Sequence, residues 1–286
     1  DQHSLETKDG RKFIAYPQVP QGQTGTVALV SLAIIELLRV ETHLERRERL
    51  LSNLEKYIKF LLFLRLPNGQ FSAFYRVDNG EALEGTSPYY DGEALLALVK
   101  AAKYLGFKNL EAIITDSAET MYQVYVTRAL AQDPNNPLTK SFYQWGSMSF
   151  YEIYTAGWPG TEKYAPRATR LASWMIYGQK ILLKRGNTAY AYEGLVSAWE
   201  LARLTRHEKA VQRIGEVIDQ GLYRLLRLQV GNPFANDFIK QHATNDPKAR
   251  GGALNAASDP VLRIDVTQHQ MHALILARRF IYKKFT

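Results

Sequence analysis

Glu84-Gly-Thr-Ser-Pro-Tyr-Tyr-Asp-Gly-Glu-Ala-Leu-Leu-Ala-Leu98 is the stretch of this 286-residue chain in which a polar, aromatic lead passes directly into an apolar segment. Pro88 suits the first turn of a helix, and Ser87 before it is a residue type that often caps a helix N-terminus. Asp91 and Glu93 fall in the first turns, where the helix dipole favours negative charge. The stretch therefore predicts a buried helix with polar and aromatic side chains at its start.

The same layout recurs along the chain. A polar or aromatic residue beside a glycine, or a Gln-His pair, stands at the head of an apolar or aromatic segment at Thr24-Gly25, Trp145-Gly146, Glu193-Gly194 and Gln268-His269. The irregular steps between these starts argue against a short solenoid repeat but suit helical hairpins with loops of varying length. A single kind of helix start organises the sequence.

Apolar periodicity predicts a chain that is almost entirely helical. Residues 27–38 are the most apolar stretch, too short for a membrane span, and are interpreted as a helix buried on most sides. Residues 44–66 follow as an amphipathic helix with one wet face, which pairs an inner helix with an outer one. Further helical segments are predicted at 88–105, 109–130, 141–158, 161–183, 188–205, 207–229 and 265–281.

Three segments lack this periodicity. Residues 1–22 are polar and form an N-terminal arm. Residues 67–87 hold turn signals at Asn68-Gly69 and Asn79-Gly80 around an alternating aromatic run, which predicts a small β-hairpin loop. Residues 230–264 form a long irregular loop. Since no shift in composition divides the rest, the arm at 1–22 is expected to precede a single domain at 23–286.

Composition limits the classes of function. The chain is 46% hydrophobic, enough for a large core, and has a net charge of +8, which either attracts an anionic partner or serves solubility. It has no cysteine, which excludes thiolate catalysis, zinc fingers and disulfides. The chain begins at Asp1 without a Met or a signal peptide, so we expect either a mature form or a trimmed one. We also expect a secreted or periplasmic location and no transmembrane segment.

Alternating inner and outer helices predict an all-α fold, an α/α toroid in which helical hairpins close into a complete or incomplete ring. A flat array would leave two apolar edges open. An open α-solenoid is the alternative. In a toroid the inner helices point the same way, so their starts meet at one mouth. That mouth would gather Tyr89, Tyr90, Asp91, Glu93, Trp145, Glu152, Tyr190, Tyr192, Glu193, Asp265, Gln268 and His269.

Aromatic rings and carboxylates together in a concave site favour a carbohydrate ligand. In this pattern, over residues 23–281, the sequence resembles the α/α-toroid carbohydrate-active superfamily, which includes six-hairpin glycoside hydrolases, polysaccharide lyases and sugar epimerases. The resemblance implies a carbohydrate-active enzyme that acts on a polysaccharide or oligosaccharide.

Two catalytic schemes stay open. In a glycoside hydrolase, Asp91 and Glu193 are the candidate acid and base or nucleophile, with Asp265 as a third, although each also suits a plain helix-capping role. In a lyase or uronyl epimerase, His269 would be the base and Arg263 would bind the uronate, unless Arg263 only pairs with Asp259 or Asp265 at the surface. A non-catalytic toroid that binds a polysaccharide or a protein is the rival from another class.

Other chemistries have weaker signals. Asp265, His269 and His272 share one helical face at a spacing that suits a metal, but no HExxH motif is present, and we expect no metal and no cofactor. No Walker motif or Gly-rich turn between a strand and a helix indicates nucleotide use. Nucleic-acid binding is not expected, because the aromatic residues cluster with acids instead of bases.

Overall fold

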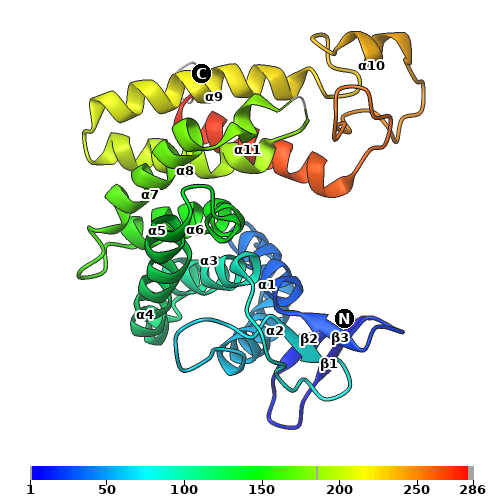
Figure 1. Ribbon diagram of the computed structural model, residues 1–286. Coiled ribbons are helices and arrows are strands. Elements are labelled where there is room, and N and C mark those ends of the chain that lie inside the picture. The colour runs from blue at the N-terminus through cyan, green and yellow to red at the C-terminus, as the bar shows by residue number, and fades with distance from the viewer. Residues whose placement is uncertain (1, 185, 283–286) are drawn as a thin grey trace. The chain divides into compact units, whose positions relative to one another are not determined.

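The computed structural model describes residues 2–184 and 186–282, which fall into two compact units, Asp1–Thr161 and Glu162–Thr286. Helices make up 62% of the structure, whereas the described sheets are two pairs of three-residue strands, so the chain is predominantly helical as predicted (Figure 1). The single domain expected for residues 23–286 stays a prediction.

The first unit contains an inner row of helices with outer helices packed against it (Figure 1). The inner row consists of α1 (Thr24–Leu38), α3 (Pro88–Leu105) and α6 (Pro137–Ala156), with α3 in contact with both of the others. The outer helices are α2 (Leu44–Phe63), which packs against α1, and α4 (Glu111–Tyr122), which packs against α3. The predicted pairing of inner with outer helices is therefore present within this unit.

The inner helices run in the same direction. Near their N-terminal ends, Gly25 of α1 lies against Glu93 of α3, and near their C-terminal ends Glu36 of α1 pairs with Lys100 of α3. Antiparallel helices would instead match the start of one with the end of the next. Helices α3 and α6 are matched in the same order, at Gly92–Trp145 and Lys103–Glu152.

Helix α3 follows the sequence prediction to the residue. Pro88 occupies the first turn, and the helix ends at Gly106, whose φ of +84° is left-handed backbone that favours glycine. Ser87 occupies the N-cap position with extended backbone, as predicted, although its side chain makes no capping hydrogen bond. Its carbonyl accepts the first hydrogen bond of the helix from the Asp91 N–H at 2.9 Å.

Two other predicted helices differ in extent or burial. Helix α6 begins at Pro137 because the Asn136 side chain accepts a hydrogen bond from the Leu138 N–H at 3.0 Å, so Trp145 lies well inside the helix and not at its start. Helix α1 is less buried than its composition suggests. Leu29 and Leu37 are 46% and 43% exposed, so only one face of α1 meets the core.

The predicted helix at 109–130 is interrupted. A 3₁₀ turn at Lys108–Leu110 precedes α4, a π-helical segment follows at Gln123–Arg128, and α5 (Ala129–Gln132) closes the run. A π turn holds one more residue than an α turn and so rotates the side chains around it. The segment includes Tyr125, which is 2% exposed.

The N-terminal arm forms small sheets. Strand β1 (Ser4–Glu6) pairs antiparallel with β2 (Lys12–Ile14), and β3 (Gln21–Gln23) pairs antiparallel with β4 (Phe74–Arg76). The hairpin predicted within 67–87 is therefore only partly right, because β4 takes its main partner from the arm and makes a single bridge, at Tyr75–Ala82, inside the loop.

The second unit is built around α8 (Ala189–Leu204), which packs against α7 (Tyr164–Ser173), α9 (Glu208–Leu226) and α11 (Ile264–Phe280) (Figure 1). Helices α8 and α9 are antiparallel, since Tyr192 meets Gly221 and Trp199 meets Gly215. Helices α8, α9 and α11 match the predicted segments 188–205, 207–229 and 265–281 closely.

The remaining parts of this unit are irregular. The predicted helix at 161–183 breaks into α7, a π-helical segment at Trp174–Gly178 and a 3₁₀ turn at Lys180–Leu183. The long loop at 230–264 contains α10 (Asp237–Gln241), and isolated β-bridges at Gln229–Ala253 and Leu254–Leu262 hold it in shape.

Candidate functional site

Asp91 is fully buried at the start of α3. Its carboxylate accepts hydrogen bonds from the Tyr125 hydroxyl at 2.5 Å and the Phe71 N–H at 2.8 Å, with the Gln70 amide at 3.4 Å. Burial raises the pKa of Asp91 to about 7, although these donors act in the opposite direction. Asp91 thus fastens the 67–87 loop and the π-helical segment to α3, and this geometry gives it a structural role.

The predicted starts of α1 and α3 do lie together. A Cβ on Gly25 would overlap the Glu93 carboxylate and meet the Tyr90 ring, so the absence of a side chain lets the two helices approach. The Tyr90 ring stands edge-on to Phe74, and burial followed by the charge of Glu93 raises its pKa. Tyr89 is 46% exposed beside them.

The third predicted helix start, Trp145-Gly146 in α6, lies on the other side of α3. A Cβ on Gly92 would come within 2.5 Å of the Trp145 Cβ, so α3 and α6 touch along their backbones here. Trp145 is 7% exposed and is mainly a packing residue. The three segments predicted as helix starts in the first unit therefore lie together, but Trp145 is in the middle of α6, and both Trp145 and Asp91 are buried.

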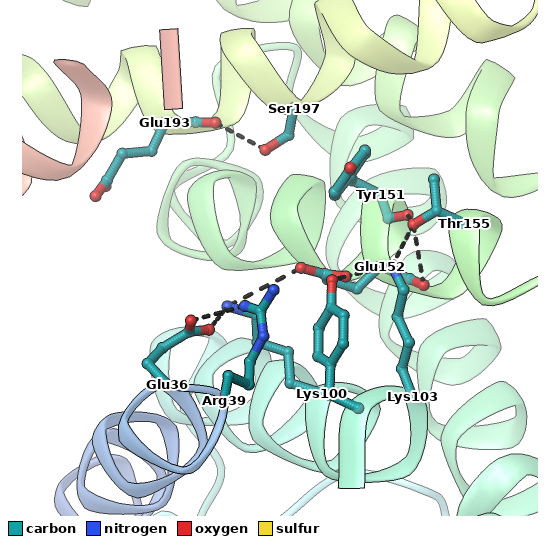
Figure 2. Close-up of polar contacts among 10 residues, drawn as sticks. Glu36, Arg39, Lys100, Lys103, Tyr151, Glu152, Thr155, Glu193 and Ser197 are labelled. Carbon is teal, nitrogen blue, oxygen red and sulfur yellow. Dashed lines mark hydrogen bonds and ion pairs between the residues drawn. The ribbon is translucent and has the colours of Figure 1, made fainter. Parts of the chain in front are cut away.

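Glu152 lies near the other end of the inner row, in a cluster of charges at the C-terminal ends of α1, α3 and α6 (Figure 2). Lys103 pairs with Glu152 at 2.6 Å, the Tyr104 hydroxyl donates to it at 2.8 Å, and Lys100 lies 4.0 Å away. The same cluster includes Glu36, which pairs with Arg39 and Lys100. Cations here complement the negative ends of the three helix dipoles.

Glu193 of α8 holds two histidines of α11. The Glu193 side chain is fully buried, and its two carboxylate oxygens lie 3.0 Å from Nδ1 of His269 and 2.7 Å from Nδ1 of His272. The imidazoles are 24% and 35% exposed. Figure 2 shows Glu193 on α8, where its backbone carbonyl also accepts a bond from Ser197 at 2.9 Å. The contact joins residues 76 and 79 positions apart in the chain.

This arrangement fixes the tautomer of the rings. A carboxylate oxygen only accepts hydrogen bonds when ionised, so each imidazole donates its Nδ1–H, and in a neutral ring the lone pair is then on Nε2. Nε2 of His272 makes no hydrogen bond to any residue within 2–184 and 186–282. His272 therefore offers a part-exposed proton acceptor whose orientation is set by a buried carboxylate.

Asp265, Arg263 and Tyr192, which were also predicted for the site, have other partners. Asp265 and Arg263 form an exposed ion pair at 2.5 Å, which lowers the pKa of Asp265 and matches the alternative of a surface pair. Tyr192 faces α9, where its hydroxyl accepts from Arg224 at 3.2 Å. Gln268 is exposed and Tyr190 is half-buried.

Sequence reasoning named Glu193 and His269 but considered His272 only as a metal ligand. The signal that would have found it is its spacing, because residues three apart on a helix lie on the same face. The contact of His272 with Glu193 could not be predicted from the spacing within α11, because Glu193 lies on another helix. Among the described residues, no group of three or more His, Cys, Asp and Glu is placed to hold a metal ion.

Comparison with known proteins adds no family. No protein-family model matches the chain, and no match is found among curated proteins. Within the described residues, none of the helices combines the length and the apolar character that a membrane crossing requires.

Proposed function

We propose that this protein is a carbohydrate-active enzyme and that Glu193, His269 and His272 form its acid–base centre. The observation that carries the proposal is the buried Glu193 carboxylate shared by two part-exposed imidazoles. A carboxylate that orients a histidine and stabilises its protonated form is a recurrent device for proton transfer. We further propose the α/α toroid as the architecture, which the parallel inner row of the first unit supports.

The chemistry best suited to this centre is proton abstraction from a uronate sugar, as in a lyase or epimerase. The C5 hydrogen of a uronate is acidic because the neighbouring carboxylate delocalises the negative charge that forms. His272 would take this proton through Nε2, and Glu193 would stabilise the imidazolium. The net charge of +8 favours an acidic glycan, and a secreted or periplasmic location remains part of the proposal.

The paired-carboxylate scheme has less support. A glycoside hydrolase needs both carboxyl groups in contact with the sugar. Asp91 is fully buried among protein donors, and Asp265 is bound to Arg263, so neither resembles a carboxyl group that waits for substrate. Hydrolysis through these residues is therefore the second choice.

The test is to incubate the protein with alginate, pectate and glucuronan. Elimination would appear as ultraviolet absorbance of an unsaturated uronate, and epimerisation in D₂O as deuterium at C5 by NMR. His272→Gln should lower kcat by about 10²–10⁴-fold, the range for loss of a general base. Glu193→Gln should lower it by more than about tenfold, because an amide cannot accept from both rings.

His43→Gln is the matched control, since His43 is exposed and its side chain makes no capping hydrogen bond. It should retain full turnover. Turnover that survives in His272→Gln would overturn the assignment of the base. Saccharide binding without any turnover would instead support the non-catalytic binder.

A further inference from the structure

A concave feature lies against α8 and the C-terminal end of α9. It is a pocket of about 220 Å³ that involves the segment around Leu182, helix α8 at Tyr192 and helix α9 near Arg224. Tyr192 and Glu193 are neighbours in α8, but Tyr192 meets Gly221 of α9 whereas Glu193 meets the histidines of α11. The pocket is therefore separate from the proposed acid–base centre.

The charged residues that line this pocket are all positive among the residues that the structure describes. They are Lys184, Arg224 and Arg227, and no described carboxylate is part of the lining. Within the described part of the chain, the side chains of Lys184 and Arg227 make no ion pair or hydrogen bond. Arg224 donates to the Leu182 carbonyl at 2.9 Å and to the Tyr192 hydroxyl at 3.2 Å, which are both neutral.

These cations contrast with those at the C-terminal ends of the inner row. In the cluster at the end of the inner row, Lys100 and Lys103 meet Glu36 and Glu152 directly. Three cations that share one concavity repel one another, and a bound anion relieves that repulsion. Arg224 is held in place by its two neutral acceptors, so its remaining N–H groups are pre-oriented, as anion recognition by guanidinium requires.

The apolar residues that line the pocket indicate which kind of uncharged group the anionic ligand carries. Leu182, Leu225 and Leu228 line the pocket and are 6%, 2% and 6% exposed. The leucine side chains offer no hydrogen bonds and favour an apolar body, although Thr188 and Asn236 also line the pocket. The volume is below the roughly 300–1,000 Å³ of sites for drug-sized ligands, so it suits a ligand of about one ring.

We propose that this pocket binds a small carboxylate with an aliphatic or aromatic body. The carboxylate would meet Arg224, Arg227 and Lys184, and the body would lie on the leucines. The site does not depend on the proposed enzymatic activity, since it shares no residue with Glu193, His269 or His272.

Benzoate is the probe, titrated into the full chain at low ionic strength and followed by saturation-transfer NMR and calorimetry. We expect saturable binding that weakens with added salt, because exposed charges are screened. Lys184→Gln and Arg227→Gln should each weaken it by about tenfold, and the double variant by more. Both side chains lack partners, so these variants should fold normally.

Arg213→Gln is the matched control on the same helix, because Arg213 pairs with Glu216 and lies outside the pocket lining. It should bind benzoate like the wild type, as should His272→Gln. The proposal is overturned if benzoate shows no saturable binding, or if the double variant binds like the wild type. Tighter binding of glucuronate or inorganic phosphate than of benzoate would contradict the proposal that the ligand has an apolar body.

Discussion

Asp91 carries an unusual protonation equilibrium for a carboxyl group. Its folded pKa of about 7 lies above the ordinary value of 3.8, so the folded protein binds a proton that the unfolded chain releases between these two pH values. The contribution of Asp91 to the free energy of unfolding is therefore greatest below pH 3.8 and decreases as the pH rises to about 7. Ionised Asp91 therefore costs the folded state stability at neutral pH and above.

We predict that the wild type is roughly 2–3 kcal/mol less stable at pH 8 than at pH 5 from this group alone. Asp91→Asn keeps the size of the side chain and an acceptor for the Phe71 N–H, so the Asn variant should lose this slope. Urea unfolding at the two pH values measures it. Asp78→Asn, which changes an exposed partner of Arg76, should retain the wild-type slope, and a slope unchanged in Asp91→Asn would contradict the pKa.

The residues of the site illustrate what a sequence can reveal at this scale. The local pattern placed Glu193 and His269 near the starts of helices, and they lie in the first two turns of α8 and α11. It did not show that they touch, because the contact depends on how α8 and α11 pack. It also treated Asp91 like Glu193, although one is tied to backbone and tyrosine donors and the other to imidazoles.

At the scale of elements, glycines set the distance between helices. A Cβ on Gly221 of α9 would overlap the ring of Tyr192, which is 1% exposed and held by Arg224. A Cβ on Gly215 of the same helix would lie 3.2 Å from Nε1 of Trp199, a half-buried side chain that can move slightly. The two positions therefore differ in packing but share a helix.

Gly221→Ala should destabilise the protein by about 1–3 kcal/mol, since overpacking outweighs the roughly 0.5–1 kcal/mol that alanine gains in a helix. Gly215→Ala should be neutral or slightly stabilising. Chemical unfolding of both variants gives the comparison. Equal effects at the two positions would show that the close approach of α8 and α9 is not rigid.

Helix limits were predictable where local signals agree. Helix α3 has proline at its start and glycine past its end, and its limits match the sequence prediction. The predicted start of α6 at residue 141 is too late, because the capping residue Asn136 and the first-turn residue Pro137 precede the apolar pattern from which the helix is predicted. The breaks at Gln123–Arg128 and Trp174–Gly178 had no signal, since π turns arise from packing.

At the scale of the whole molecule, each unit has its own core. Phe13, Phe60, Tyr75 and Phe142 are buried in the first unit, and Tyr192, Leu201 and Ile218 in the second. We predict two heat-capacity transitions in calorimetry at pH 8. Asp91→Asn should shift one of them and Gly221→Ala the other, whereas a single transition that both variants shift would mean that the chain unfolds as one cooperative body.

The common direction of α1, α3 and α6 also has an electrical consequence. Aligned peptide dipoles add, and with about half a negative charge at each C-terminus the three ends together resemble an anion of about −1.5. Arg39, Lys100 and Lys103 against Glu36 and Glu152 leave one positive charge in excess there, which offsets most of it. Glu93 lies at the opposite end of the row, against the start of α1, so charged side chains oppose the backbone dipoles at both ends and the inner row has only a small net electric moment.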